Sequence, residues 1–478
     1  MKSDSGPGPD SPSTSPAEAA PRSFTRSMRV TGVLFLTLSA VTPASSVFVV
    51  IPGIIQQAGT GAFLAMAAAA LVALAMAFVY AELASAFPLA GGEYAMMGHA
   101  LNPFVGFVFM GMNVVGSTLP PAILALGAST YLTAIWPAAQ SVPVAVGIVA
   151  AATVFGILNI RLNAWVTGAF LLVEVVALIV LTALGFSHMH RGVASLIAHP
   201  MVLNAGVLKA APLGVIALAT AVGVFSYNGF GAAVYFSEEM HDAPRRVART
   251  ILWALGLTVL FEFVPMTAVL LGAPDLAALL GSPSPFSDFV RATGGPVIGA
   301  AVGLGVALSI VNAVIAIVLI NARFLYSSGR DRVWHQELNG VLVRVHDRFD
   351  SPWVAALLAG ATGIAACFIP FNVLLVLTGA SVVVMYALLC VAVIVGRVSR
   401  RTAHGVYRMP LFPLAPFVGL LALVYILYAN WLDLAVGRPS LIATFVMLVA
   451  AGLYFFVLRR RRGATWVMTG AADEAGPS

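Results

Sequence analysis

Two short polar stretches interrupt long apolar runs of this sequence, and both could bind a charged solute. Residues 42–46 read TPASS and residues 226–231 read SYNGFG. Where a helix is interrupted, the freed amides at a half-helix N-terminus suit an anion and the freed carbonyls suit a cation. Two carboxylates also lie deep in apolar runs, Glu174 in LLVEVVALIV and Glu262 in TVLFEFVPM. These residue types predict reversible binding of a charged solute or ion.

The elements that must position these residues are membrane helices. Of the 478 residues, 60% are hydrophobic and 9% charged, with a mean hydropathy of +0.97, whereas a soluble domain has about 25% charged residues. Runs such as LAMAAAALVALAMAFVY lack the alternation of an outer-membrane barrel. Because roughly 20 apolar residues cross a bilayer as a helix, we predict an all-α integral membrane protein with twelve spans, at residues 30–57, 62–87, 104–136, 142–160, 163–186, 213–237, 250–272, 296–327, 352–370, 373–395, 416–436 and 440–458.

The distribution of basic residues predicts the orientation. With a cytoplasmic N-terminus, all but four of the 25 Lys and Arg residues fall in cytoplasmic segments, the exceptions being Arg191, Lys209, Arg291 and Arg438. This positive-inside bias predicts that both termini are cytoplasmic. It also accounts for the net charge of +6, so we expect no nucleic-acid partner. A bias towards Ala, Gly, Val and Arg is typical of a high-GC bacterium, and we expect the plasma (inner) membrane.

The two polar interruptions indicate a repeat. Non-helical backbone in a bilayer persists only inside protein or along a water-filled cavity. A kink at Pro43 would by itself explain the first interruption, but residues 223–239, GVFSYNGFGAAVYFSEE, place a second one at a similar depth in the sixth span. Interrupted helices five spans apart indicate an inverted repeat of five helices. Spans 1–5 and 6–10 then form the two halves, and spans 11 and 12 are an addition.

Several motifs resemble those of the amino acid–polyamine–organocation superfamily, which has the LeuT-like fold. The most specific is FSYNGFGAAVYFSEEM followed by HDAPRRVARTI, which is similar to that family's glycine break, paired glutamates and basic loop. YAELASAFPLAGGEYA, NARFLYSSGRDRVW and YRMPLFPLAP agree, and the resemblance spans residues 30–460. One departure lies at the first break, where many relatives have Gly-Ser-Gly and this sequence has Ala44, Ser45 and Ser46.

The resemblance implies an organisation and a function. The expected parts are a disordered cytoplasmic tail at 1–23, rich in Pro, Ser and Gly, a transporter core at 24–396, two further helices at 397–458 and a cytoplasmic tail at 459–478. The implied function is that of a permease, not an enzyme, which moves an amino acid across the lipid bilayer by alternating access. The substrate carboxylate would bind amides of the first break, and its amine would bind carbonyls of both breaks.

The same resemblance implies a set of substrate-binding residues: Thr42, Ala44, Ser45, Ser46, Phe225, Ser226, Tyr227, Asn228, Gly229 and Phe230. Phe230 stands where the family often has an aromatic gate. No Arg, Lys or Asp lies well inside spans 1, 3, 6, 8 or 10, so we expect a neutral α-amino acid. A polyamine permease, a γ-aminobutyrate permease and an amino acid exchanger of the same fold are the alternatives.

Glu174 is the candidate coupling residue. Its spacing from Arg161 places it where many sodium-independent relatives carry a lysine that replaces a bound cation. An ionisable group at this depth costs roughly 2.5–3.5 kcal/mol on insertion scales and so indicates function. We hypothesise that Glu174 takes up and releases a proton. The alternatives are a sodium ligand helped by Ser309 or Asn312, and a protonated carboxyl bonded to a neighbour.

Other polar groups have simpler interpretations. Glu262 has no role in the family, and we expect a structural hydrogen-bond anchor. The inner end of span 6 carries Glu238 and Glu239, and the run R-x-x-x-S-S-G-R-D-R at residues 323–332 follows span 8. Together with Arg245, Arg246 and Arg249, these charges predict either an inside gate or solvated loops. The loop histidines, His188, His190 and His199, do not indicate a metal site.

The sequence leaves three classes of function. It has no Walker-type loop after a strand, and we expect no cofactor. A channel would show a continuous polar stripe or a selectivity loop, which this sequence lacks. An intramembrane enzyme would need a catalytic set, and nothing in the sequence places Glu174 and Glu262 together. A transporter explains both interruptions, the repeat and the buried acids, while the oligomeric state is open.

Overall fold

The computed structural model describes residues 26–135, 141–378 and 380–462. The predicted tail at residues 1–23 and residues 463–478 of the predicted C-terminal tail lie outside this part of the chain. Within it, nine helical segments are long and apolar enough to cross a membrane, and two shorter apolar helices lie at Ser141–Ile157 and Trp353–Ala366. The protein is mostly helical, as predicted.

The described chain consists of helices, two short strands and three turns of π or 3-10 helix. The elements of the first five predicted spans are α1 (Val30–Val41), α2 (Pro43–Ser45), the π-helical η1 (Ser46–Val50), α3 (Ile51–Ala58), the 3-10 turn η2 (Gly59–Gly61), α4 (Ala62–Ala86), α5 (Glu93–Ala100), α6 (Pro103–Thr118), α7 (Pro120–Ile135), α8 (Ser141–Ile157) and α9 (Ile160–Ser187). The later elements are α10 (Val193–Ala198), β1 (Met201–Asn204), β2 (Val207–Ala210), α11 (Leu213–Ser226), the 3-10 helix η3 (Phe230–Glu239), α12 (Ala243–Gly272), α13 (Leu276–Gly281), α14 (Pro285–Arg330), α15 (Gln336–Leu342), α16 (Trp353–Ala366), α17 (Phe371–Thr378), α18 (Ser381–Val398), α19 (Leu414–Leu432) and α20 (Gly437–Arg462).

Two further spans, which the sequence predicted as continuous, are each divided into two helices. The third, at 104–136, consists of α6 and α7, because Pro120 and Pro121 lack the amide N–H groups that would continue α6; its last residue, Trp136, lies outside the described residues. The tenth, at 373–395, consists of α17 and α18. By contrast, the predicted start of the eighth span, Pro296, lies inside α14. Gly295 before it has non-helical backbone angles (φ 82°, ψ 175°), so α14 is kinked at this point.

A small hairpin is a departure from the all-helical prediction. Strands β1 and β2 pair antiparallel, with Met201 opposite Ala210. Ala205 and Gly206 between them both have positive φ, as the primed two-residue turns of hairpins require. The hairpin is tied to η2, because the Thr60 hydroxyl accepts the Met201 amide at 2.7 Å. The eight paired residues are too few to show a strand pattern in an apolar sequence.

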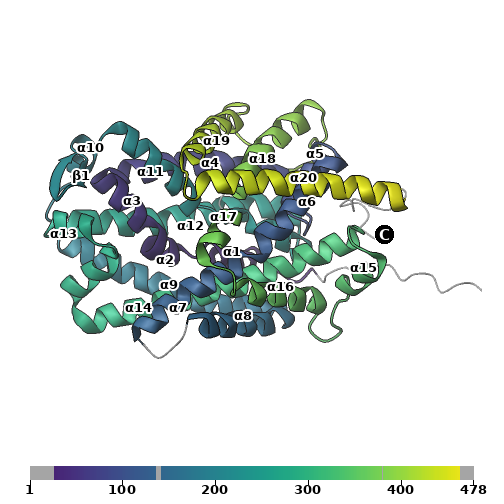
Figure 1. The fold of residues 1–478 in the computed structure, drawn as a ribbon, viewed down its shortest axis with the longest axis horizontal. Coiled ribbons are helices and arrows are strands. Elements are labelled where there is room, and N and C mark those ends of the chain that lie inside the picture. Colours follow the sequence, from purple (N-terminus) through teal and green to yellow (C-terminus); the bar gives the residue numbers. More distant parts are fainter. Residues whose placement is uncertain (1–25, 136–140, 379, 463–478) are drawn as a thin grey trace, which may run out of the picture.

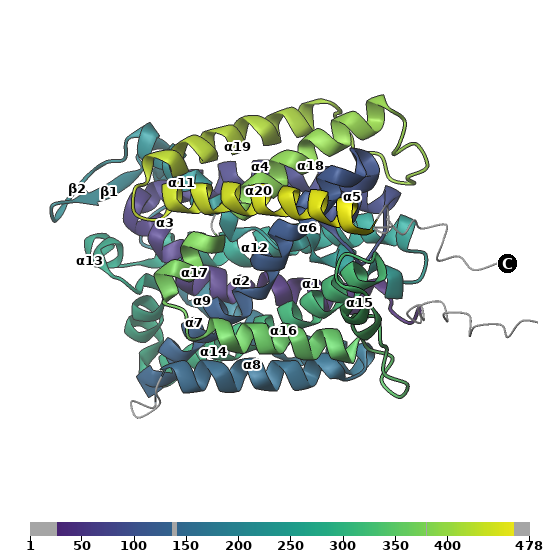
Figure 2. The ribbon, with the colours of Figure 1, turned by 45° about the vertical axis from the view of Figure 1, so that its right-hand side comes forward.

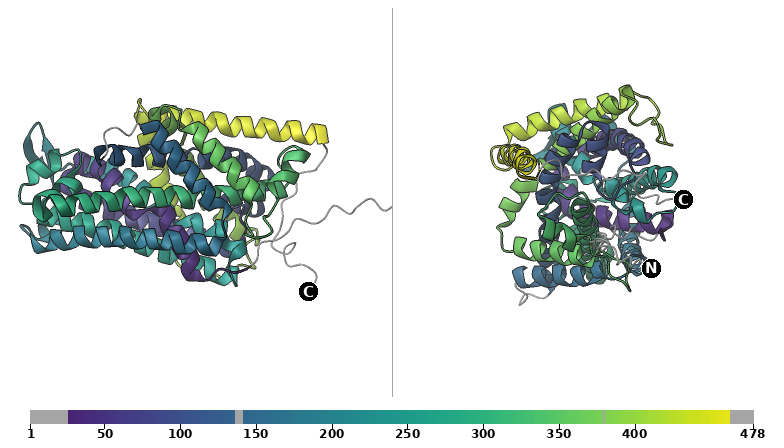
Figure 3. Two further views of the ribbon diagram at one scale, coloured as in Figure 1. Left: turned by 90° about the horizontal axis from the view of Figure 1, so that it is seen from below. Right: turned by 90° about the vertical axis from the view of Figure 1, so that its right-hand side faces the viewer.

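The helices run side by side along the long axis of the molecule (Figure 1). In both Figure 1 and Figure 2, α1 and α2 lie in the middle while α8 and α19 lie at opposite edges. The views from below and from one end show that α20 lies at the periphery (Figure 3). Most of α14 is buried, whereas only 17% of the most apolar stretch of α20 is buried. The interrupted first span is therefore enclosed by the other helices, where non-helical backbone can find protein partners.

Candidate functional site

The first interruption lies between α1 and α2. Thr42 adopts a left-handed conformation (φ 50°, ψ 72°), and Pro43 begins α2. Proline has no amide N–H and disfavours helical geometry at the residue before it, which explains why α1 ends at Val41. The chain then passes through the π-helical turn at Ser46–Val50. The amide of Ala44 lies in the first turn after the break, where it has no partner within the helix.

The second interruption lies between α11 and η3. Gly229 has φ +112°, a conformation that glycine adopts without steric cost. A Cβ atom at this position would lie 2.9 Å from Cγ2 and 3.2 Å from Cα of Val41. The Ser46 hydroxyl also donates to the Ser226 carbonyl at 3.3 Å. The two interruptions are therefore in direct contact with each other.

Glu174 reaches the first interruption from α9. Its side chain is fully buried, and its Oε1 atom accepts the Ala44 amide at 2.7 Å. Its Oε2 atom is buried and has no hydrogen-bond partner among the described residues. The carboxyl group thus accepts a hydrogen bond from the backbone amide that has no partner within the helix because of the interruption at Pro43.

Glu262 reaches the second interruption from α12. It is fully buried, and its Oε2 atom accepts the Ser226 hydroxyl at 2.6 Å. The predicted hydrogen-bond anchor is found at this oxygen, but Oε1 has no partner among the described residues. Within the same part of the chain neither Glu174 nor Glu262 forms an ion pair. Nothing in the sequence places these two carboxylates together, yet each contacts one of the two touching interruptions.

The two candidate residues of α14 lie along α1. Thr42 donates its hydroxyl to the Ser309 carbonyl at 3.4 Å. The Asn312 amide nitrogen donates to the Ser39 hydroxyl at 2.9 Å and to the Thr167 carbonyl at 3.2 Å. Ser309 is thus linked to the break through Thr42, whereas the Asn312 amide group is held about one turn away at Ser39.

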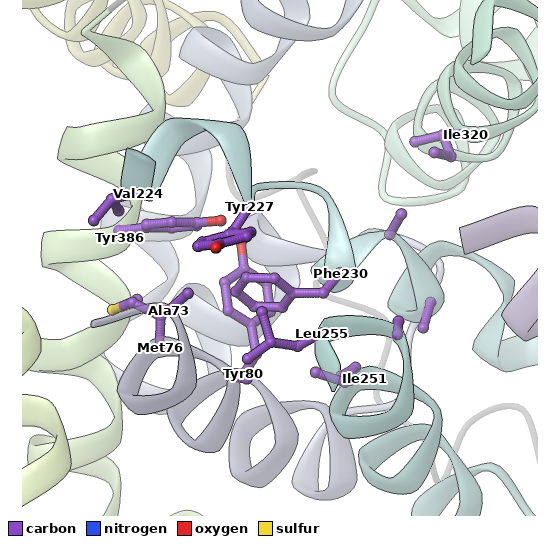
Figure 4. Close-up of a cluster of buried hydrophobic side chains, with 14 of the residues drawn as sticks. Ala73, Met76, Tyr80, Val224, Tyr227, Phe230, Ile251, Leu255, Ile320 and Tyr386 are labelled. Carbon is purple, nitrogen blue, oxygen red and sulfur yellow. The ribbon is translucent and has the colours of Figure 1, made fainter. Parts of the chain in front are cut away.

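An aromatic cluster lies beside the second interruption (Figure 4). The Tyr80 ring meets Phe230 edge to face at 5.6 Å and Tyr386 at 5.7 Å, and the Tyr386 hydroxyl donates to the Asn228 side chain. Tyr227 points into this group, but its buried hydroxyl has no partner among the described residues. Sequence reasoning missed Tyr80 and Tyr386, since nothing within α4 or α18 distinguishes them from other apolar-face aromatics.

The remaining candidates divide into buried and exposed ones. Ala44, Ser45 and Ser46 are buried within the first interruption. Phe225 is 51% exposed, so the structure does not bring it into the aromatic cluster with Phe230. Its place in α11, one residue before the buried Ser226, turns it to another face of the helix.

The acids at the far end of η3 are paired with arginines of the run at residues 323–332, and not with the basic residues that follow η3 in the chain. Glu239 binds Arg323 at 2.5 Å, and Glu238 binds Arg330 through contacts of 2.9 and 3.0 Å. Glu82 of α4 likewise binds Arg397 of α18 with two contacts of 2.6 Å. The nearby basic residues Arg245, Arg246 and Arg249 are exposed. We call the six paired residues the ion-pair end: Glu82, Glu238, Glu239, Arg323, Arg330 and Arg397.

A helical membrane protein with two touching helix interruptions and unpaired buried acids has the organisation of a solute transporter. The chain belongs to the amino acid permease family, whose model matches residues 29–457. It is therefore a multi-pass membrane transporter and not an enzyme. This result confirms the resemblance found from the motifs.

Three relatives show how broad this family is. An uncharacterised transporter of Mycobacterium tuberculosis is 31% identical over 66% of this chain and 68% of its own length. The methylthioribose transporter of Bacillus subtilis is 23% identical over 93% of this chain and 96% of its own. The branched-chain amino acid permease BcaP of Bacillus subtilis is 22% identical over 93% and 95%. The two Bacillus subtilis relatives carry different substrates in their names, so family membership leaves the substrate open.

Proposed function

We propose that this protein is a secondary active transporter that moves an amine-bearing solute of the amino acid or polyamine type by alternating access. The observation that carries the proposal is the direct contact between the two interruptions, at Gly229 and Val41. Each interruption frees backbone groups in the middle of the protein, and a solute bound there can be reached from either side as the halves move.

The proposed architecture is the twelve-span LeuT-like fold with its inverted repeat of five helices. The segment Val30–Ala86 covers the first two spans, and the shorter helices α8 and α16 supply the fourth and ninth. The proposed orientation has both termini in the cytoplasm of a cell whose plasma membrane holds the protein. The ion-pair end then lies on the cytoplasmic side, where it joins η3 to α14.

The proposed solute site comprises Thr42, Ala44, Ser45 and Ser46 of the first interruption and the Ser226–Phe230 segment of the second. A neutral α-amino acid is the substrate that sequence reasoning favours, and a relative named for branched-chain amino acids supports it. The alternatives are a polyamine or γ-aminobutyrate, and exchange in place of symport. Direct uptake measurements distinguish these solutes.

Glu174 is the proposed proton-coupling residue. Its bond to the Ala44 amide ties α9 to the first interruption at 2.7 Å, and a bond to an ionised acceptor is about twice as strong as one between neutral groups. A proton on Glu174 therefore weakens the tie and frees the break to move. Sodium coupling through Ser309 and Asn312 is the alternative. The Asn312 amide nitrogen is bonded to Ser39 and Thr167, and its buried Oδ1 atom, the one that a sodium ion would use, has no partner among the described residues.

Uptake into proteoliposomes with an inside-alkaline pH gradient tests this function. We expect at least one labelled amino acid, γ-aminobutyrate or putrescine to accumulate faster with the gradient, and Glu174→Gln to abolish the acceleration. Thr182→Val on the same helix is the control, since the Thr182 hydroxyl bonds only within α9, to Leu178. Gradient-independent uptake that needs preloaded solute would establish exchange instead, and a sodium requirement would transfer the coupling role to sodium.

A further inference from the structure

We propose that Glu262, together with Glu174 and Tyr227, binds the ammonium group of the transported solute, and that this solute carries a net positive charge. This inference rests on the proposed function, because it places the solute between the two interruptions. It assigns a role to Glu262, which sequence reasoning left as a structural anchor. It also selects a cationic amine over a neutral zwitterion.

Three polar atoms at the interruptions are buried and have no partner among the described residues: Oε2 of Glu174, Oε1 of Glu262 and the hydroxyl of Tyr227. All three side chains are fully buried. Buried polar atoms in proteins are otherwise satisfied in about nine cases of ten. Glu174 is bonded to Ala44 and Glu262 to Ser226, the Ser46 hydroxyl donates to the Ser226 carbonyl, and Tyr227 follows Ser226 in the chain. Three unsatisfied oxygens in one place indicate a shared partner.

The chemistry of this site favours donors in the solute. The Ala44 amide is bound to Glu174, and the Ser226 hydroxyl is bound to Glu262. The hydroxyls of Thr42 and Ser46 donate to carbonyls of Ser309 and Ser226. A solute carboxylate would thus meet occupied donors and two acids. An ammonium group has three donors and no acceptor, which matches three free oxygens.

The charge of the site then determines the charge of the solute. When Glu174 carries the coupling proton, an ionised Glu262 leaves one negative charge in a buried site, and an unpaired buried charge is strongly unfavourable. A neutral zwitterion leaves that charge uncompensated, whereas a monovalent amine cancels it. The rings of Tyr227, Phe230, Tyr80 and Tyr386 group beside the second interruption (Figure 4), and aromatic faces attract ammonium groups.

Matched small ligands can isolate each charge. Butylamine carries only the ammonium group, butyrate only the carboxylate, leucine both, and putrescine two ammonium groups. We measure the shift in thermal denaturation midpoint of the purified protein with each compound, and the competition of each with uptake into proteoliposomes. We expect stabilisation by putrescine and butylamine, and none by butyrate.

Variants of Glu262 test whether this residue carries the effect. We expect Glu262→Gln to weaken amine binding at least tenfold and Glu262→Asp to restore part of it. Thr258→Val is the matched control, expected to bind within twofold of the original protein. It lies one turn earlier on α12, is buried, and has a hydroxyl that bonds within the helix to Ala254 at 2.8 Å. An unchanged denaturation midpoint of ligand-free Glu262→Gln shows that the variant folds.

The outcomes separate this inference from the proposed function. Gradient-driven leucine uptake that neither amine inhibits, with Glu262→Gln unchanged, would overturn the cationic site and leave the transporter proposal intact. If no solute is taken up with or without the pH gradient, the transporter proposal fails, while amine stabilisation that depends on Glu262 still supports the cationic site. If neither putrescine nor butylamine stabilises the protein, the cationic site is overturned.

Discussion

Five of the buried carboxylates of this protein fall into two regions with opposite pairing. At the ion-pair end, Glu82, Glu238 and Glu239 each bind an arginine. At the interruptions, Glu174 and Glu262 bind neutral donors, and one oxygen atom of each has no partner among the described residues. All five acids are buried, so burial alone does not explain the difference. What differs is whether a fixed cation accompanies the acid.

The two regions therefore suit different tasks: the paired acids hold segments of the protein together, and the acids at the interruptions can bind a cation. The paired acids join segments distant in the chain, since Glu239 ends η3 while Arg323 lies in α14. Glu238 additionally accepts the Ala90 amide from the turn after α4, at 2.7 Å. A fixed arginine occupies the position that an exchangeable cation would take. At the acids of the interruptions, this position is not taken by an arginine. The ion-pair end is therefore suited to close one side of the protein, and the interruptions to bind what crosses it.

The largest expected effect comes from removing a fixed cation. Arg323→Met leaves Glu239 buried and unpaired, and removing one partner of a buried ion pair costs about 3–5 kcal/mol. We expect a large drop in the thermal denaturation midpoint in detergent. The double variant Arg323→Met, Glu239→Met should recover most of it, because apolar replacement of a whole pair is often neutral.

The matching change at the interruptions is Glu262→Met, which removes an acid that has no fixed cation. We expect it to leave the midpoint unchanged or raise it. If Arg323→Met and Glu262→Met destabilise the protein equally, the distinction between the two regions is wrong.

The second effect concerns the contact between the interruptions. Gly229→Ala forces a side chain into positive φ, where such strain costs of order 1–3 kcal/mol, and its Cβ atom would press on Val41. We expect uptake to fall at least tenfold. Gly256→Ala is the control, because a Cβ atom there meets nothing within 4 Å and alanine favours a helix interior by about 1 kcal/mol. Equal uptake by the two variants would show that the close approach is dispensable.

Much of this arrangement could be predicted from local sequence. Pro43 and Gly229 mark the interruptions because their backbone preferences act within a few residues. The exact pairing could not be predicted: Glu174 meets Ala44 across 130 positions, and within the predicted group of inner charges Glu239 binds Arg323 rather than the nearby Arg245. Local spacing carries no information on which helix faces pack together. For the same reason Glu262 was predicted as a structural anchor and not as a group that reaches the same pair of interruptions as Glu174.

The third effect distinguishes a free hydroxyl from a bonded one. Tyr227→Phe removes a hydroxyl without a partner among the described residues, so we expect no loss of stability. If the hydroxyl accepts the solute ammonium, amine affinity should fall roughly threefold to tenfold, the equivalent of one hydrogen bond of about 0.5–1.5 kcal/mol.

Tyr386→Phe provides the comparison for Tyr227→Phe. This variant removes a hydroxyl that donates to Asn228, and we expect it to lower the denaturation midpoint. Binding titrations and thermal denaturation on both variants check the pair. Unchanged amine affinity in Tyr227→Phe would exclude that hydroxyl from the site.

The smallest effect isolates an amide–carboxylate contact just past the eleventh span, because α19 ends at Leu432 and not at the predicted residue 436. Asp433, after α19, accepts the amides of Gly437 at 2.9 Å, Ala435 at 3.0 Å and Val436 at 3.4 Å. The Gly437 amide, aided by the other two and opposed by partial burial, holds the pKa of Asp433 below its ordinary value. Its stabilisation is therefore present above a pH of about 4 and is lost as the pH falls through the lower folded-state pKa.

We expect Asp433→Asn to lower the denaturation midpoint slightly at pH 6, with a difference from the original protein that shrinks below a pH of about 4. Asp275→Asn is the control for loss of a single amide–carboxylate bond, since Asp275 accepts the amide of Ala278. A difference that persists at low pH would mean that side-chain shape, not charge, holds this turn. Glu174 also accepts a backbone amide at a helix interruption, so Asp433→Asn shows what such a contact contributes in the presence of water. If Glu174→Gln has a larger effect on transport, the difference comes from the buried surroundings of Glu174, which contain no fixed cation.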